Sequence, residues 1–165
     1  MKLLMVLFLA LAAPGCLMFD TGPHTPDAKL IENFYKNRDD FERLVTMCEE
    51  DPNMNRIAGD FLWRTDHAGW PRLESEWGIS KQRWDDYRNL FAKLGLPAGL
   101  SNAQPKMVLL LASTRGMVGS GSTKGYAYLS QPPPQLVDLL DDYKFERSGA
   151  VYRHLEGNWY LFLET

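Results

Sequence analysis

The chain opens with a short apolar segment, and this segment limits where the rest of the chain folds. Lys2 precedes an apolar run of eleven residues from Leu3 to Ala13, and small residues then lead to Cys16. A positive start, a short apolar stretch and a small-residue exit are the parts of a secretory signal. The run is too short to cross a bilayer, which needs about 20 residues. We therefore expect residues 1–15 to be a signal peptide and the protein to be exported.

The residues around Cys16 resemble the lipobox of bacterial lipoproteins. Ala13 and Gly15 are small, as expected ahead of the cysteine in that motif, and Pro14 departs from it. The resemblance implies that Cys16 becomes the first residue of the mature chain and carries acyl groups that bind a membrane. Leu17 is not the aspartate that retains many such proteins in the inner membrane. By analogy, this favours the periplasmic face of the outer membrane.

Two other interpretations of the leader remain open. Cleavage in the Ala10–Ala12 stretch without lipidation would secrete the chain to the periplasm. An uncleaved anchor from Leu3 to Phe19 would be short and interrupted by Pro14 and Gly15. In either case, residues 16–27 contain glycine and prolines and are expected to form a tether.

The remaining residues, 28–165, suffice for one domain with its own core. Hydrophobic residues make up 45% of the chain, which is ordinary for a globular protein. The net charge is −3 and no basic block stands out, which argues against a nucleic-acid partner. Cys48 is the only cysteine in the body, so we expect no disulfide framework there.

Two amphipathic helices are predicted in the first part of the body. Thr25, Pro26 and Asp27 form a helix start, and apolar residues at helical spacing then continue to Cys48, before Asp51-Pro52 ends the helix. Cys48 lies on the apolar stripe, so we interpret it as a core thiol. The second helix is expected to begin after Ser80 as its cap and to end at Gly95 in a left-handed conformation.

The later part of the chain indicates strands. Residues 56–64 suggest one strand, residues 106–113 a central strand and residues 126–129 its partner, and the last runs form a hairpin around a glycine turn. Residues 135–143 have helical spacing but are few, and their structure is left open between helix and strand. We therefore expect an α+β domain with two amphipathic helices packed on one face of an antiparallel β-sheet. The element order is similar to that of cystatin-like and NTF2-like folds.

The glycine-rich segment between Arg115 and Gly125 suggests a phosphate loop but does not match one. Gly116 and Gly121 have the required spacing, whereas Ser122 stands where the lysine is needed, and a strand follows instead of a helix. A flexible hairpin turn is the simpler interpretation. The alternative is a small anion-binding or ligand-binding loop. Its candidate residues are Arg115, Ser122, Thr123 and Lys124.

The irregular stretch from residue 65 to 78 contains the other candidate groups. Asp66, His67, Glu74 and Glu76 match no metal-ligand spacing, and we expect no metal or cofactor. Trp70 and Trp77 are candidates for stacking on the sugar rings of a cell-wall ligand, although core packing is the simpler interpretation. No serine stands in a nucleophile motif.

These features predict an exported, lipid-anchored envelope protein whose domain is a non-catalytic binding or structural module. The body is similar to small uncharacterised lipoproteins of Gram-negative bacteria, a likeness that implies no activity. One alternative is a carrier of a small apolar ligand, which requires a pocket between helix and sheet. The other is a cell-envelope hydrolase built on Asp66, His67, Glu74 and Glu76. The expected partners are the membrane, reached through Cys16, and an envelope protein or a cell-wall ligand.

Overall fold

The computed structural model describes residues 22–66, 73–104, 107–116 and 121–165. Within these residues, three α-helices and one seven-stranded antiparallel sheet confirm the predicted α+β class. The helices are α1 (Asp27–Lys36), α2 (Arg38–Glu50) and α3 (Lys81–Leu94), with a short 3-10 helix at Glu74–Glu76. The strands are β1 (Met54–Ile57), β2 (Leu62–Arg64), β3 (Leu100–Gln104), β4 (Met107–Arg115), β5 (Ser122–Leu129), β6 (Ala150–Glu156) and β7 (Trp159–Glu164).

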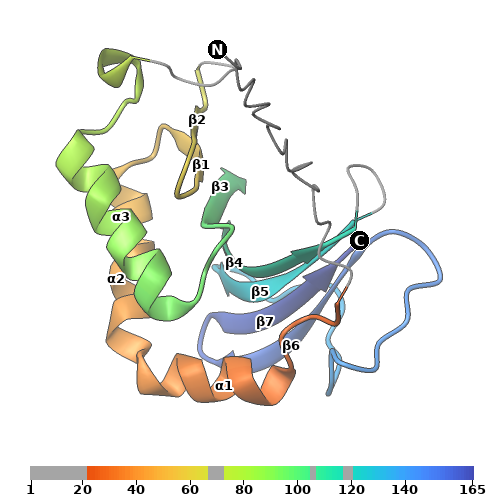
Figure 1. Ribbon diagram of the computed structural model, residues 1–165. Helices are drawn as coiled ribbons and strands as arrows, with labels where there is room; N and C mark the ends of the chain where they lie inside the picture. Colours follow the sequence, from red (N-terminus) through yellow and green to blue (C-terminus); the bar gives the residue numbers. More distant parts are fainter. Residues whose placement is uncertain (1–21, 67–72, 105–106, 117–120) are drawn as a thin grey trace, which may run out of the picture.

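The strands lie in the order β2-β1-β3-β4-β5-β7-β6, and each neighbouring pair is antiparallel. The predicted C-terminal hairpin is confirmed as β6 and β7, which turn at Gly157 with a φ of 52°. A long connection, residues 130–149, joins β5 to β6. Figure 1 shows α2 and α3 side by side at one side of the molecule and the long connection at the other.

The second predicted helix, α3, has the caps expected from its sequence. The Ser80 side chain accepts a hydrogen bond from the Arg83 amide, and Gly95 adopts the left-handed conformation with a φ of 66°. The Leu96 amide then donates to the Phe91 carbonyl at 2.9 Å. These contacts satisfy groups that every helix end leaves without an intrahelical partner, so the local sequence suffices to define both ends.

The first predicted helix is wrong in one respect, because the chain forms two helices there. The break lies at Asn37, whose φ of −122° is not helical. Its side chain donates to the Asn33 carbonyl at 3.1 Å and thereby competes with the helical ladder. The interruption allows α2 to take a direction different from that of α1 (Figure 1).

Two strand-region predictions also need correction, and the structure of residues 135–143, left open from the sequence, is now described. Residues 56–64 contain a turn between β1 and β2 instead of one strand. The partner strand β5 begins at Ser122, so residues 122–124 belong to the sheet and not to a flexible turn. Residues 135–143 form neither a helix nor a named strand, and Leu136 makes only an isolated bridge to Tyr152.

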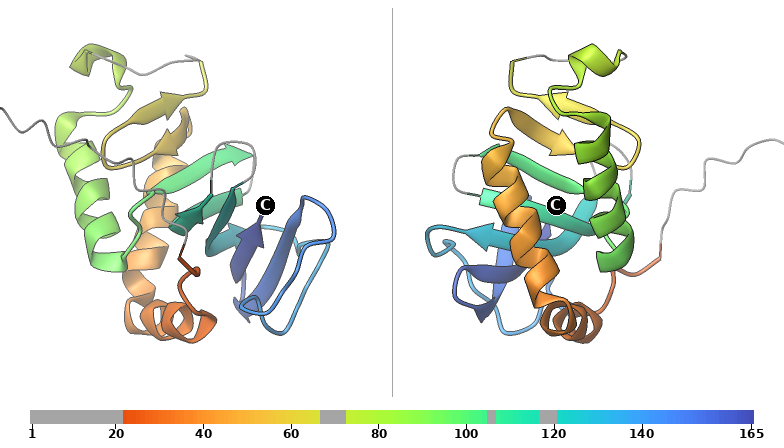
Figure 2. Two further views of the ribbon diagram at one scale, coloured as in Figure 1. Left: turned by 45° about the vertical axis from the view of Figure 1, so that its right-hand side comes forward. Right: turned by 90° about the vertical axis from the view of Figure 1, so that its left-hand side faces the viewer.

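Buried apolar side chains form two clusters. The larger one joins the buried apolar residues of all three helices to alternate residues of the strands. At its centre the rings of Phe34 and Phe41 contact each other, and each also contacts Tyr126 and Trp159. The smaller one contains strand residues such as Leu109, Ala127 and Phe162. Figure 2 (right) shows α2 and α3 in front of the strands. The period-2 alternation of β-strands explains the division into two clusters.

Candidate functional site

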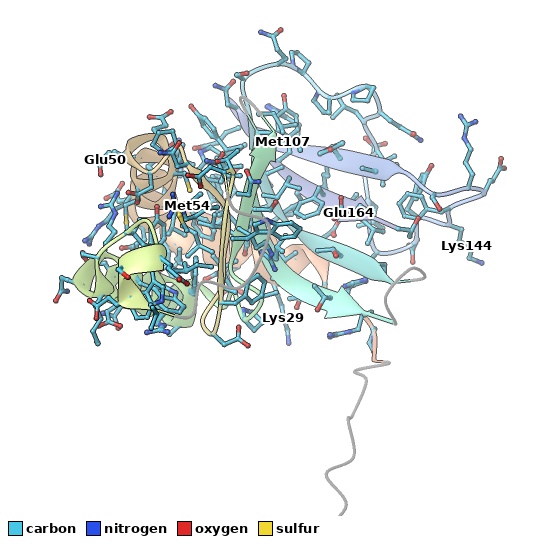
Figure 3. All side chains as sticks on the ribbon, turned by 90° about the horizontal axis from the view of Figure 1, so that it is seen from above. Lys29, Glu50, Met54, Met107, Lys144 and Glu164 are labelled. Atoms are coloured by element: carbon cyan, nitrogen blue, oxygen red, sulfur yellow. The ribbon has the colours of Figure 1, made fainter. Side chains whose placement is uncertain are left out.

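A pocket of about 520 Å³ lies where the tether meets the sheet and the long connection. Its volume falls within the range of small-molecule sites, roughly 300–1,000 Å³. The polar lining groups are His24, Ser122, Lys124, Asp141 and Thr165, and the apolar ones are Pro23, Pro26, Leu140, Tyr143, Phe145 and Leu163. Figure 3 shows Lys144 and Glu164, neighbours of lining residues, on the side of the molecule away from Glu50.

Four charged side chains form what we call the inner cluster: Asp27, Lys124, Asp141 and Arg153. The Lys124 ammonium is 2.6 Å from a carboxylate oxygen of Asp27 and also contacts Asp141. Arg153 donates to the other Asp27 oxygen at 2.9 Å. Lys124 and Asp27 are each only 1% exposed, so both charges lie in the interior and compensate each other there.

The inner cluster also fixes the start of α1. The Asp27 amide donates to both oxygens of the Asp141 carboxylate, at 3.1 and 3.0 Å. In return, the Asp27 carboxylate accepts from the Leu140 amide at 2.9 Å. A carboxylate at a helix N-terminus is stabilised by the helix dipole and by the free amides there. The cluster therefore holds the tether, β5 and the long connection together at the base of the pocket.

The surroundings of Asp27 change its acidity. Burial by itself raises the pKa of a carboxyl group, because the charged form loses its hydration. Hydrogen bonds from Lys124, the Leu140 amide and Arg153 outweigh that effect, and the pKa of Asp27 lies below its usual value. Asp27 is therefore an ionised carboxylate at neutral pH, and it balances the positive charge of Lys124 beside the pocket.

His24 connects the tether to two neighbouring strands. Its Nδ1 lies 2.7 Å from the hydroxyl of Ser113 on β4, and its Nε2 lies 2.7 Å from the hydroxyl of Ser122 on β5. Arg115 fastens the preceding residues, because its guanidinium donates to the carbonyls of Gly22 at 2.9 Å and Pro23 at 3.1 Å. His24, which the sequence placed in a tether, thus belongs to the folded body and lines the pocket.

Part of the long connection forms the apolar wall. Tyr143 and Phe145 are in edge-to-face contact with ring centroids 5.0 Å apart, and Leu140 is buried against the core. The Gln135 amide donates to the Tyr143 hydroxyl at 2.8 Å. An aromatic pair held in this way offers a fixed apolar surface to a ligand.

Of the four residues predicted for a ligand-binding loop, only two line the pocket. Ser122 and Lys124 line the pocket. The ammonium group of Lys124, however, is paired with the carboxylates of Asp27 and Asp141 and not with a free anion. Arg115 binds the tether. Thr123 lies between Ser122 and Lys124 on β5, so strand alternation places it on the opposite face.

Of the two tryptophans considered for stacking on sugar rings, Trp70 and Trp77, the structure describes Trp77. Trp77 packs edge to face against Trp84, with centroids 4.7 Å apart, and is partly buried against the core. This matches the interpretation of Trp77 as a core residue. Trp70 lies outside the described residues.

The acidic residues proposed for a hydrolase do not form a common site among the described residues. Asp66 is paired with Arg64 at 2.5 Å, and the same guanidinium donates to the Glu76 carbonyl at 3.1 Å. Glu74 is exposed, and His67 lies outside the described residues. Within those residues, no group of three side chains is arranged to hold a metal ion.

Cys48 is a core thiol, as predicted from its position on the apolar stripe. It is 2% exposed, and burial raises its pKa to about 12. Since the thiolate is the reactive form, this cysteine is inert at neutral pH.

Comparison with known proteins found no matching family model, no matching curated protein and no matching solved structure. Among the helices of the described residues, none combines the length and the apolar character needed to cross a membrane.

Proposed function

We propose that this chain is an exported, lipid-anchored envelope protein whose domain holds a small ligand in the pocket beside the inner cluster. The ligand is a largely apolar molecule with at least one hydrogen-bonding group. The observation that carries the proposal is the pocket of about 520 Å³, with an apolar wall and a few convergent polar groups. That combination is typical of small-molecule sites.

The lining of the pocket defines the chemistry of the ligand. Leu140, Tyr143, Phe145 and Leu163 offer apolar surface, which favours a ligand of the same character. The hydroxyl of Ser122 and the imidazole of His24 supply the polar contacts. Because the charges of Lys124 and Asp27 are already paired, they favour a neutral ligand over an anion.

The proposed cellular location of the protein rests on its N-terminal leader. The charged start, the short apolar run and Cys16 after small residues support export and acylation. Several acyl chains hold a protein on a membrane firmly, whereas one chain binds only weakly.

The position of the pocket relative to the proposed anchor supports a role near the membrane. Pro23, which lines the pocket, follows Cys16 by only seven positions in the chain. Fully extended, seven residues reach no more than about 25 Å. With Cys16 acylated, the pocket stays within that distance of the membrane surface and takes its ligand from there.

The pocket is tested with Nile red, a neutral apolar dye that fluoresces in apolar surroundings. We expect saturable binding by the full-length protein. Phe145→Ala should weaken binding about tenfold, because loss of part of an apolar wall costs about 1.4 kcal/mol. Tyr35→Ala is the matched control, since it removes a ring that is 52% exposed and does not line the pocket.

Two results would contradict the pocket proposal. One is the absence of saturable dye binding by a protein with a native circular dichroism spectrum. The other is equal weakening in Phe145→Ala and Tyr35→Ala, because dye bound at scattered surface sites does not depend on one wall of the pocket.

The anchor is tested separately by growing cells with a labelled fatty-acid analogue. We expect the wild-type protein and Cys48→Ala to carry the label and Cys16→Ala to lose it, since Cys48 is buried in the core. Equal labelling of Cys16→Ala would remove the lipid anchor from the proposal, and so would a native protein with Met1 intact.

A further inference from the structure

The pocket contains a serine and a histidine in hydrogen-bond contact. The Ser122 hydroxyl lies 2.7 Å from Nε2 of His24, and both residues line the pocket. On the other side of the ring, the Ser113 hydroxyl lies 2.7 Å from Nδ1, and Ser113 is only 4% exposed. The imidazole is therefore held between a buried hydroxyl and one at the pocket wall.

The two contacts allow complementary roles for the two ring nitrogens. A neutral imidazole has one N–H donor and one acceptor nitrogen. With the proton on Nδ1, the ring donates to the Ser113 oxygen, and Nε2 accepts the hydrogen bond from the Ser122 hydroxyl. This is the arrangement in which a histidine takes the proton of a serine nucleophile, and a third group orients the base.

The position of the imidazole is fixed from both sides along the chain. Arg115 holds the carbonyls of Gly22 and Pro23, which precede it. Asp27, which follows it, is fixed by Lys124 and Arg153. A base held in place before the substrate binds does not have to be ordered during the reaction.

We propose that Ser122 is a nucleophile for acyl transfer, with His24 as its general base and Ser113 as a positioning residue. The substrate class is a small ester with an apolar acyl group, which fits the wall formed by Leu140, Phe145 and Leu163. This proposal uses the same pocket as the proposed function but adds a covalent step.

The reaction proceeds in two balanced steps. The Ser122 oxygen attacks the ester carbonyl carbon while its proton passes to Nε2 of His24. The carbon–oxygen bond of the ester then breaks, and the proton on Nε2 goes to the departing alkoxide. This leaves an acyl-serine and a free alcohol. In the second step water attacks the acyl-serine, His24 takes the proton of the water and returns it to Ser122, and the carboxylic acid is released.

The third group is a hydroxyl instead of the carboxylate found in many triads. A hydroxyl orients the imidazole but does not compensate the positive charge that develops on it. We therefore expect acylation to be slower than in carboxylate triads, and covalent capture of Ser122 is a more sensitive test than turnover.

The experiment treats the full-length protein with a fluorophosphonate, which phosphonylates serines activated by a base. Intact-mass spectrometry measures the extent of labelling, and peptide mapping locates it. We expect one label, on Ser122. Ser122→Ala and His24→Gln should each lose at least ten-fold in labelling, and His24→Gln keeps an amide that can still bond both serines.

Two further variants separate chemistry from structure. Thr123→Ala removes the adjacent hydroxyl on the opposite face of β5 and should label like the wild type. Ser113→Ala should label more slowly, and Ser113→Thr should restore the rate because it returns the hydroxyl to Nδ1.

Each outcome decides the proposal. Labelling of Ser122 that depends on His24 supports it. Absence of labelling in a wild-type protein with a native circular dichroism spectrum overturns it, as does a label that maps elsewhere or persists in Ser122→Ala. Nile red binding without labelling would refute the nucleophile and leave the ligand pocket standing, whereas labelling without dye binding would do the reverse.

Discussion

Two groups of charged residues join distant parts of this fold, and they do so in different surroundings. The inner cluster connects the tether, β5, β6 and the long connection beside the pocket, and its Lys124 and Asp27 are each 1% exposed. What we call the outer cluster, Glu50, Asp51 and Arg83, connects α2 to α3. There, the side chain of Arg83 is 25% exposed and that of Glu50 is 60% exposed.

The outer cluster is well bonded in spite of its exposure. Arg83 is 2.7 Å from both Asp51 and Glu50, and the Tyr87 hydroxyl donates to Asp51 at 2.8 Å. Burial alone lowers the pKa of Arg83, but the bonds to the two carboxylates raise it above its usual value. Water still solvates these charges in part. The cluster therefore stabilises the contact between α2 and α3 only modestly, and the loss of one member costs little free energy of unfolding.

The inner cluster has a different energetic character. Removing water from two charges costs several kcal/mol, and the attraction between them compensates only while both are present. Such a cluster adds little net stability but makes any single loss expensive. The outer cluster thus supports a contact between two helices, whereas the inner cluster fixes the geometry of a site. Three measurements test this difference.

The largest effect is expected when one buried charge is removed. Lys124→Met leaves the Asp27 carboxylate with Arg153 and the Leu140 amide as its remaining partners, and should lower the free energy of unfolding by about 3 kcal/mol. Arg83→Met, the matched change in the outer cluster, should cost about 1 kcal/mol. Urea denaturation of both variants measures the difference. Equal losses would show that burial does not distinguish the two clusters.

The sequence predicted those parts of the fold that depend on neighbouring residues. Ser80 and Gly95 define α3 because caps act within one turn of the helix. The final hairpin was predicted from two β-rich runs around Gly157 for the same reason. The burial of Cys48 was predicted from the helical spacing of the apolar residues around it.

The site was not predictable in the same way, because its contacts are distant in sequence. Lys124 meets Asp27 across 97 positions of the chain, and His24 meets Ser113 and Ser122 across 89 and 98. One local signal was available: Lys124 alternates with Tyr126 on β5, which would have placed the lysine on a buried face. The glycines that follow Arg115 pointed instead to a turn.

An intermediate effect on the free energy of unfolding is expected when the pH is lowered. The pKa of Asp27 lies below its usual value, so its ionised form favours the folded state. This contribution is fully present above the unfolded pKa of 3.8 and is lost as the pH falls through the lower folded value. The free-energy difference between the wild type and Asp27→Asn should therefore narrow as the pH falls below about 4. Denaturation curves at several pH values measure it.

The control for this experiment is Asp142→Asn, which removes an exposed carboxylate next to the inner cluster in sequence. At neutral pH, Asp142→Asn should lower the free energy of unfolding by less than Asp27→Asn does. A deficit of Asp27→Asn that is constant down to pH 2.5 would mean that the folded state does not favour the ionised carboxylate.

The smallest effect is expected from salt on the outer cluster. Glu50 is exposed, so Glu50→Gln should lower the free energy of unfolding by only about 0.5 kcal/mol at low ionic strength. In 1 M NaCl, where screening acts over about 3 Å, this deficit should vanish, whereas the deficit of Lys124→Met should persist. Because buried pairs are screened far less than exposed ones, salt separates the clusters without altering any contact. If 1 M NaCl reduced both deficits alike, Lys124 would be accessible to ions, and the base of the pocket would be open to solvent instead of closed by the inner cluster.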